Sequence, residues 1–221
     1  MKNQWRKIDE AVKQGLLEDK DLHNFLEPIL HAKSDREDFI KKCLKKISTR
    51  RMLLRAQWYT EIADDQQKIR QGRPALRILF LLGLAEALAK KRIGNQHLES
   101  FKAIQEFFKY ISVSDRNVLQ TSFKRTLLHP RQPMLRFSSI LRILYDIRNR
   151  AVHGDDFFSF SLMDKERKKE HAHFSSFGLI TSGYLGPRKR KKRISLDIKL
   201  TYEELRDIFR RTAIANIQSI L

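Results

Sequence analysis

The chain has 221 residues, of which 41% are hydrophobic and 14 are phenylalanine, which excludes a disordered chain and allows a sizeable core. Its 45 lysines and arginines against 26 acidic residues give a formal net charge of +19, so a polyanionic partner is expected. A single cysteine excludes an intramolecular disulfide, and no segment suits a secretory signal or a membrane span, so we expect a cytoplasmic protein without a membrane partner.

Residues 1–71 are predicted to form an N-terminal helical extension. Apolar residues recur at helical spacing over residues 5–31, which indicates one or two short amphipathic helices. Ser34 and Glu37 have the spacing of a capping box, so a long helix is expected to run from residue 35 towards residue 70. The basic residues of that helix, which are expected to attract a polyanion, are Lys41, Lys42, Lys45, Lys46, Arg50, Arg51 and Arg55.

Residues 72–221 are predicted to form a larger helical domain of the bundle type. Its expected helices cover residues 75–91, 97–111, 115–128 and 135–153. The first of them contains an apolar run over residues 78–89, interrupted by the single charge of Glu86, and is expected at the centre of the bundle. Gly94 is expected to help end this helix, and Ser114 is expected to cap the third.

The last third of the chain changes character. Residues 174–184 have a β-type composition, and apolar and polar residues alternate over residues 194–200, so a β-hairpin is predicted at about residues 174–200. Thr201 and Glu204 then match a capping box that opens a final helix. The predicted fold class is mainly α: a helical bundle with an N-terminal helical extension, a small C-terminal β-hairpin and a final helix.

Six consecutive basic residues are expected at the tip of the hairpin, where they can contact phosphates without reading a base sequence. They are Arg188, Lys189, Arg190, Lys191, Lys192 and Arg193. Two alternatives remain open: a solvated hairpin tip and, in a eukaryotic protein, a nuclear localisation signal.

Three polar residues occur together at the end of the helix predicted over residues 135–153. Arg148 carries a guanidinium that can hold phosphate, Asn149 an amide, and His153 an imidazole with an ordinary pKa of about 6.5. Asn149 precedes His153 by four residues, so both lie on one helix face and the amide can orient the imidazole. Cleavage of RNA without a metal needs a proton acceptor, a proton donor and positive charge at the phosphate, which these groups can supply. The expected core residues of this helix are Phe137, Ile140, Leu141, Leu144, Ile147 and Val152.

Arginine and histidine occur at a similar spacing in two other places, Arg92 with His97 and Arg167 with His173. Gly94 interrupts the first pair, and the second lies in a strongly polar segment without an apolar face. A polar following residue, apolar flanks and an unbroken helical pattern are combined only around Arg148, which predicts the functional site there.

The pattern Arg148-Asn149-x-x-x-His153, with the apolar helix upstream of it, resembles the signature of the HEPN family (higher eukaryotes and prokaryotes nucleotide-binding) over roughly residues 70–155. The resemblance implies a HEPN-like helical bundle and a metal-independent endoribonuclease without a cofactor, whose composite active site lies at a homodimer interface. It further implies RNA as substrate, a toxin or an anti-phage or CRISPR-linked defence role, and a possible protein antitoxin or regulatory partner. One branch of the family has a tyrosine two residues after the histidine; Asp155 stands at that position here, which argues against the modification associated with it.

Other interpretations are open from the sequence. His153 can cap the last carbonyls of its helix while Arg148 and Arg150 are ordinary exposed residues. A HEPN-like fold can also act as a non-catalytic nucleic-acid- or nucleotide-binding scaffold. A metal site at His171 and His173 is not predicted, because a stable site needs three or four placed ligands.

Overall fold

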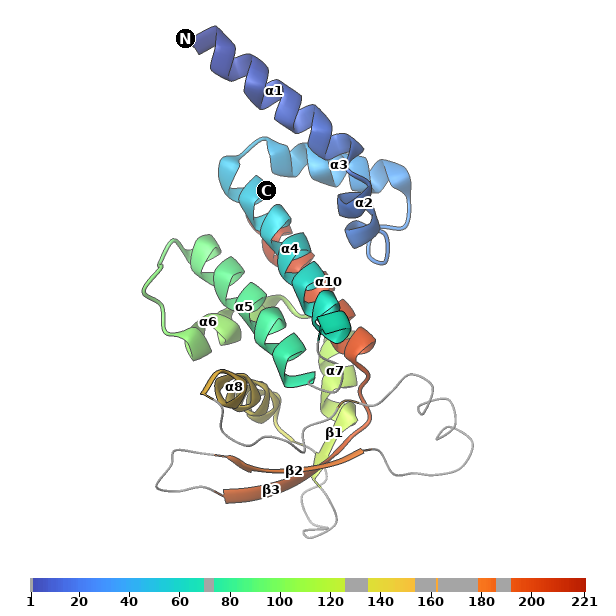
Figure 1. Ribbon diagram of the computed structural model, residues 1–221, viewed down its shortest axis with the longest axis vertical. Helices are drawn as coiled ribbons and strands as arrows, with labels where there is room; N and C mark the ends of the chain where they lie inside the picture. The colour runs from blue at the N-terminus through green and yellow to red at the C-terminus, as the bar shows by residue number, and fades with distance from the viewer. Residues whose placement is uncertain (1, 70–73, 126–134, 154–161, 163–178, 186–191) are drawn as a thin grey trace.

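The computed structural model of the chain describes residues 2–69, 74–125, 135–153, 162, 179–185 and 192–221. The described part is mainly helical, with a small antiparallel sheet near one end of an elongated molecule and helix α1 at the other (Figure 1). The fold class predicted from the sequence, mainly α with a small C-terminal hairpin and a final helix, is therefore confirmed. No helix among the described residues has both the length and the apolar character required to cross a membrane.

Helical segments make up most of the described chain. In chain order they are α1 (Lys2–Glu18), α2 (Lys20–Leu26), α3 (Lys33–Leu44), α4 (Ile47–Ile69), α5 (Pro74–Ile93), α6 (Ser100–Phe107), the 3-10 helix η1 (Phe108–Tyr110), α7 (Val113–Ser122), α8 (Phe137–His153) and α10 (Tyr202–Gln218).

The long helix expected from residue 35 towards residue 70 is two helices, α3 and α4. Buried Thr49, in the first turn of α4, contacts the carbonyl oxygens of Cys43 near the end of α3 at 2.6 Å and of Lys46 in the link between the helices at 3.0 Å. The capping box expected at Ser34 and Glu37 was wrong, because α3 begins at Lys33 and its N-cap makes no side-chain hydrogen bond.

Helix α5 lies at the centre of the bundle, as its apolar run predicted. It packs against α4, α6, α8 and α10, and the side chains that it buries completely or almost completely are Ile78, Leu81, Leu82, Leu84, Ala85, Leu88 and Ala89. Gly94 follows with a positive φ of 76°, a conformation that favours glycine and ends the helix where the sequence predicted.

Helix α7 begins and ends earlier than expected. Its N-cap is Ser112 rather than Ser114, and the Ser112 hydroxyl accepts a hydrogen bond from the backbone of Asp115 at 3.0 Å. The helix stops at Ser122 instead of residue 128, because the next residues form strand β1 (Phe123–Arg125), which pairs with a strand more than seventy residues away in the chain.

The hairpin prediction is confirmed by strands β2 (Leu179–Leu185) and β3 (Lys192–Ile198), which pair antiparallel from Leu179 opposite Ile198 to Leu185 opposite Lys192. Residues 174–178 and 186–191 of the expected hairpin lie outside the described residues. Strand β1 pairs with the other edge of β3, so the sheet has the order β1-β3-β2, and its third strand was not predicted.

Helix α10 begins with the predicted capping box. The Thr201 hydroxyl accepts from the backbone of Glu204 at 3.2 Å, and the Glu204 carboxylate accepts from the backbone of Thr201 at 2.9 Å. These bonds satisfy two backbone N–H groups at the start of the helix that would otherwise have no partner. Water cannot replace them easily, because Thr201 is only 3% exposed.

Replacement of Thr201 by alanine is expected to lower the free energy of unfolding by about 1 kcal/mol, the usual cost of losing a hydroxyl N-cap. Urea denaturation followed by circular dichroism measures this change. Thr201→Ser should restore most of the loss, and Thr121→Ala, at an exposed position inside α7, should change stability by about 0.5 kcal/mol or less. Equal effects of the Thr201 and Thr121 substitutions would contradict a stabilising role of the cap.

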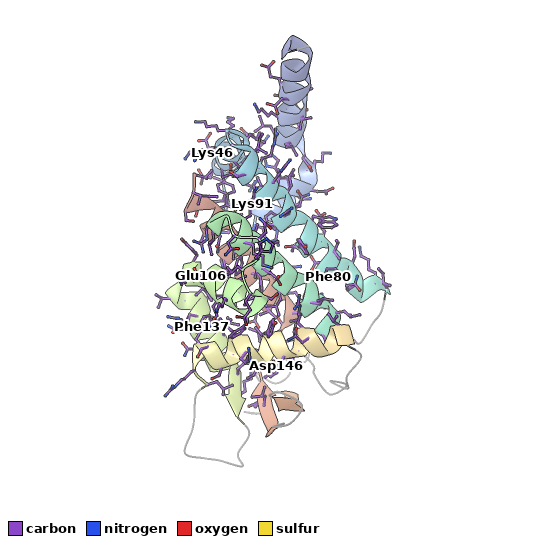
Figure 2. The ribbon with its side chains drawn as sticks, turned by 90° about the vertical axis from the view of Figure 1, so that its left-hand side faces the viewer. Lys46, Phe80, Lys91, Glu106, Phe137 and Asp146 are labelled. Atoms are coloured by element: carbon purple, nitrogen blue, oxygen red, sulfur yellow. The ribbon has the colours of Figure 1, made fainter. Side chains whose placement is uncertain are left out.

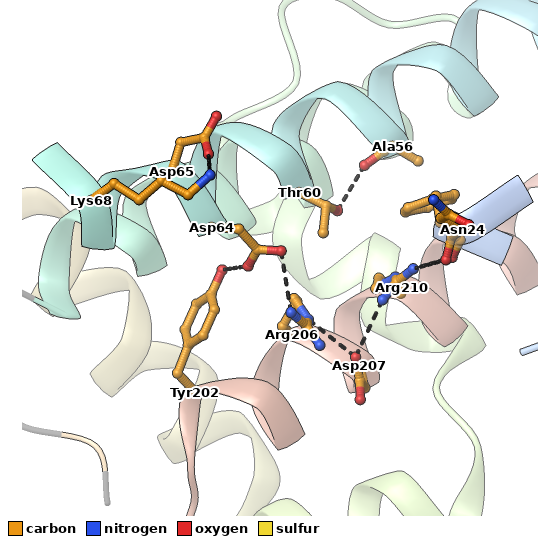
Figure 3. Close-up of polar contacts among 11 residues, drawn as sticks. Asn24, Ala56, Thr60, Asp64, Asp65, Lys68, Tyr202, Arg206, Asp207 and Arg210 are labelled. Atoms are coloured by element: carbon orange, nitrogen blue, oxygen red, sulfur yellow. Dashed lines mark hydrogen bonds and ion pairs between the residues drawn. The ribbon is translucent and has the colours of Figure 1, made fainter. Parts of the chain in front are cut away.

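Polar contacts join α10 to helices from the N-terminal half of the chain (Figure 3). The Tyr202 hydroxyl donates to Asp64 of α4 at 2.8 Å, and Arg206 contacts the other oxygen of Asp64 at 3.2 Å. Burial, together with the Asp64 carboxylate, raises the pKa of Tyr202, which therefore stays protonated as a donor. Arg210 donates to the backbone carbonyls of Asn24 at 3.1 Å and of its neighbour Phe25, so α2 is held against α10.

The predicted division into an extension of residues 1–71 and a domain of residues 72–221 stays a prediction. Within the described residues, α4 packs along α5 and α10, and one hydrophobic core contains side chains from both sides of this division.

Candidate functional site

The predicted motif lies in the last part of α8, an unbroken helix that ends at His153. Four of the expected core residues, Ile140, Leu141, Leu144 and Ile147, are at most 3% exposed, so α8 is anchored as predicted. Val152 is 53% exposed, and its expected burial was wrong. Ile143, which was not predicted as a core residue, is buried instead. Helix α8 packs against three elements, α5, α6 and α7, so its buried surface is wider than one stripe.

The side chain of Arg148 is held within the protein, with only 24% of its surface exposed. Its Nη1 donates to Oδ1 of Asn149 at 3.1 Å, and its Nη2 lies 3.5 Å from Oε2 of Glu86 on α5. The guanidinium also lies 5.8 Å from the ring centroid of Tyr145, one turn earlier on α8. Arg148 is therefore not the ordinary exposed residue of the alternative interpretation.

Glu86 connects this motif to α5 and α6. Its Oε1 accepts from Nζ of Lys90 at 2.7 Å and from the hydroxyl of Ser100 at 2.8 Å, which leaves Oε2 towards Arg148. Burial disfavours the charged carboxylate, but the hydrogen bonds from Lys90 and Ser100 and the charges of Lys90 and Arg148 outweigh it, so the pKa of Glu86 lies below its ordinary value. The site thus contains an ionised carboxylate at neutral pH.

Neither Glu86 nor Lys90 was predicted as a site residue. The signal available in the sequence was the single acidic residue inside the most apolar run of the chain, at a position where a buried charge requires a partner. That Glu86 meets Arg148, 62 residues later, depends on the packing of α5 against α8.

The arrangement favours an exchange of partners at Arg148. A separation of 3.5 Å is at the long limit of a hydrogen bond, so the contact between Arg148 and Glu86 is weak enough for an incoming phosphate oxygen to replace it. Glu86 would keep its bonds to Lys90 and Ser100 and would not be left as an unpaired buried charge. Nε of Arg148 is buried without a hydrogen-bond partner among the described residues, so the two Nη groups are the donors that a phosphate would meet.

Replacement of Glu86 by glutamine is expected to lower the free energy of unfolding at pH 7 by about 1–3 kcal/mol, because the neutral amide loses the charge attraction to Lys90 and Arg148 and accepts weaker hydrogen bonds. A carboxylate whose pKa is depressed in the folded state stabilises the protein above its unfolded pKa of about 4.3, and this contribution disappears as the pH falls through the lower folded value. Urea titrations of wild type and variant should therefore differ most at neutral pH and converge in acid. A difference that is constant down to about pH 3 would contradict the assignment.

The helix ends between the residues of the competing pair, Arg92 and His97, as the sequence predicted from Gly94. Arg92, near the end of α5, donates to the hydroxyl of Tyr110 at 2.9 Å and lies 3.6 Å from the Glu106 carboxylate, while His97 follows the end of the helix and is exposed. The second pair, Arg167 and His173, lies outside the described residues.

Some predicted site residues are only partly described. The backbone of His153 is in α8, but its side chain and that of Arg150 lie outside the described part of the structure, so the expected contact between Asn149 and His153 stays a prediction. Residues 188–191 of the basic run also lie outside it. Lys192 and Arg193 begin β3, with Lys192 opposite Leu185.

The basic residues over positions 41–55 that were expected to attract a polyanion are exposed, apart from the partly buried Arg50. Both views place the α3–α4 junction with Lys46 towards the end of the molecule that carries α1, and α8 with Asp146 towards the end that carries the sheet (Figure 2). Within the ranges that the structure describes, no group of three or more histidine, cysteine or acidic residues could hold a metal ion.

Comparison of the chain with protein-family models, with curated proteins and with solved structures found no match. The motif on α8 and its surroundings are therefore the basis for a functional proposal.

Proposed function

We propose that this protein is a metal-independent endoribonuclease of the HEPN type, in which Arg148, Asn149 and His153 act on RNA. The observation that carries the proposal is the placement of Arg148 and Asn149, which contact each other at 3.1 Å near the end of an unbroken helix that terminates at His153. The net charge of +19 supports a polyanionic substrate.

In the proposed reaction the 2′-hydroxyl of one nucleotide attacks the adjacent 3′-phosphate. A new P–O bond to the 2′-oxygen forms as the bond to the 5′-oxygen breaks, which leaves a 2′,3′-cyclic phosphate and a 5′-hydroxyl. Arg148 would stabilise the charge that develops on the phosphate, and His153 would accept or donate a proton. Asn149 would fix Arg148 and orient the imidazole.

A homodimer would supply the second proton-transfer group. The proton acceptor and the proton donor must act on opposite sides of the phosphorus, and one chain offers one motif histidine. A two-fold axis beside α8 would bring together identical patches, each with its own His153. The exposure of Val152, next to His153, is consistent with an apolar contact at such an interface.

The biological role follows from the family resemblance alone. We propose a toxin-like or defence nuclease, which acts against phage or in a CRISPR-linked system and which a protein antitoxin or regulator restrains.

The ion pair of Arg148 with Glu86 favours a second candidate, a non-catalytic nucleic-acid- or nucleotide-binding scaffold. In that case Arg148 would join α8 to α5 through Glu86, Lys90 and Ser100, and the charge of the protein would account for binding. The two candidates differ in whether bound RNA is cut.

The proposal is tested by incubating the purified full chain with end-labelled single-stranded RNA in excess EDTA. Fragments that end in a 2′,3′-cyclic phosphate are expected. Cleavage that EDTA abolishes, or fragments with a 3′-hydroxyl, would contradict the mechanism, whereas tight binding with intact RNA would favour the scaffold.

A further inference from the structure

Helix α4 presents one continuous exposed face. Ile47, Arg51, Arg55 and Trp58 are all exposed, with Ile47 at 60% and Trp58 at 56%. At about 100° per residue these four positions lie within about 80° of one another around the helix. The opposite face, which packs on the core, buries Met52, Leu53, Ala56, Thr60 and Ala63.

The exposed indole of Trp58 is supported from behind. Its ring lies edge-on to that of Tyr59, with centroids 5.2 Å apart and an angle of 66° between the planes. The Tyr59 ring is itself packed against α5 at Gly83, where an added Cβ would lie 3.0 Å from Cε1 of the tyrosine. Gly83 thus permits the Tyr59 ring to pack closely against α5. Tyr59 in turn contacts the Trp58 ring, which remains 56% exposed to solvent.

The charges beside Trp58 are free to meet an anion. Arg51 and Arg55 form no ion pair or hydrogen bond with any residue that the structure describes, and they lie on successive turns, about 6 Å apart along the helix axis. Glu61, on the other side of Trp58, is occupied by a hydrogen bond from Gln57 at 2.9 Å and would repel a phosphate. A polyanion would therefore extend from Trp58 towards Arg55 and Arg51, and not towards the end of α4.

We infer that this face of α4 is a binding surface for single-stranded RNA, in which an unpaired base stacks on Trp58 while the flanking phosphates contact Arg55 and Arg51. Aromatic stacking next to arginine is the usual means of holding unpaired bases, and it tolerates any base because each offers a π face. This inference rests on RNA being the ligand of the proposed function. Helix α4 begins near Lys46, towards the α1 end of the molecule, whereas α8 lies towards the sheet end, so RNA that follows this face would extend beyond the cleavage site (Figure 2).

The test uses the full chain with Trp5→Phe and His153→Ala, which leaves Trp58 as the single tryptophan and prevents cutting by the proposed mechanism. The probe is fluorescein-labelled oligouridine, and binding is followed by anisotropy and, with unlabelled RNA, by quenching of Trp58 fluorescence. Trp58→Ala is expected to weaken binding about 5- to 150-fold, and Trp58→Phe to retain most of it, because the phenyl ring still stacks. Duplex RNA of equal length should not quench Trp58, because its bases are already paired.

The arginines have their own readout. Arg51→Gln with Arg55→Gln should reduce the slope of log Kd against log salt by about 1.4, because each phosphate of a single strand that a side chain neutralises accounts for about 0.7 of the slope. The matched control, Lys20→Gln with Lys102→Gln, removes the same charge at exposed positions on α2 and α6 and should leave the slope nearly unchanged.

The inference is overturned if oligouridine binds without quenching Trp58, or if folded Trp58→Ala binds as tightly as its parent. Conversion of a dimer to a monomer by Trp58→Ala in sedimentation would also overturn it and assign the face to self-association. Cleavage by the chain that retains His153 is assayed in parallel. Quenching of Trp58 without any cleavage would refute the nuclease and leave the RNA surface supported.

Discussion

The His153→Ala variant is expected to cleave single-stranded RNA at least about 100-fold more slowly than wild type while it binds RNA with nearly the same affinity. Alanine can neither accept the proton of the 2′-hydroxyl nor donate a proton to the departing 5′-oxygen. Binding is expected to persist, because phosphate contacts by basic residues elsewhere account for most of the affinity of so basic a chain. Single-turnover cleavage in excess EDTA and anisotropy with the same RNA measure the two quantities separately.

The chain offers a matched control in His97→Ala. His97 follows Arg92 with four intervening residues, so it satisfies the same bare pattern, but it is exposed beyond the end of α5. Its replacement should change neither rate nor affinity. If both histidine variants cleave as fast as wild type, the motif has no part in the reaction, and any nuclease activity comes from another site or from a contaminant.

The dimer adds a second discriminating result. An inactive His153→Ala subunit mixed in excess with wild type should suppress cleavage below the level expected from dilution, since each mixed dimer contains only one motif histidine. Activity proportional to the wild-type subunits alone would mean that each chain carries a complete site.

The Phe209→Ala variant is expected to lower the free energy of unfolding by about 3–5 kcal/mol, a large part of the stability of a typical domain. Phe209 of α10 is completely buried, and its ring lies 5.9 Å from that of Phe107 and 5.1 Å from that of Phe108. Alanine would leave a cavity between α10 and the α6–η1 segment, and the smaller side chain would also gain less free energy from burial. Both effects destabilise the folded state. Equilibrium unfolding in urea measures the change.

Trp58→Ala is the control for this substitution, since it also removes a large aromatic side chain but at a position that is 56% exposed. It should cost about 1 kcal/mol or less, mainly through the contact with Tyr59. A loss at Phe209 no larger than that at Trp58 would mean that the aromatic cluster is not the centre of the core.

The elements that the sequence predicted well are those with a strong local pattern. The apolar run of α5, the alternation that becomes β3 and the capping box of α10 are each contained within fewer than about twenty neighbouring residues, and each was confirmed. The helical placement of Arg148 and Asn149 was equally predictable, because they directly follow the buried residue Ile147 and no glycine or proline interrupts residues 135–153.

Other features depended on contacts between residues far apart in the chain. Strand β1 exists because Phe123 pairs opposite Ile198, and no local signal in residues 123–125 distinguishes it from a continuing helix. Val152 fits the apolar spacing of α8 and is nevertheless exposed, because no described element covers that part of the helix.

Local periodicity and composition were sufficient to predict the helical class, the hairpin, the basic character and the helical location of Arg148 and Asn149. The contact of Glu86 with Arg148 and the support of Trp58 by Tyr59 became visible only in the packed helices. Side-chain partners across a bundle are set by the way helices pack, and packing brings together residues at any separation in the chain.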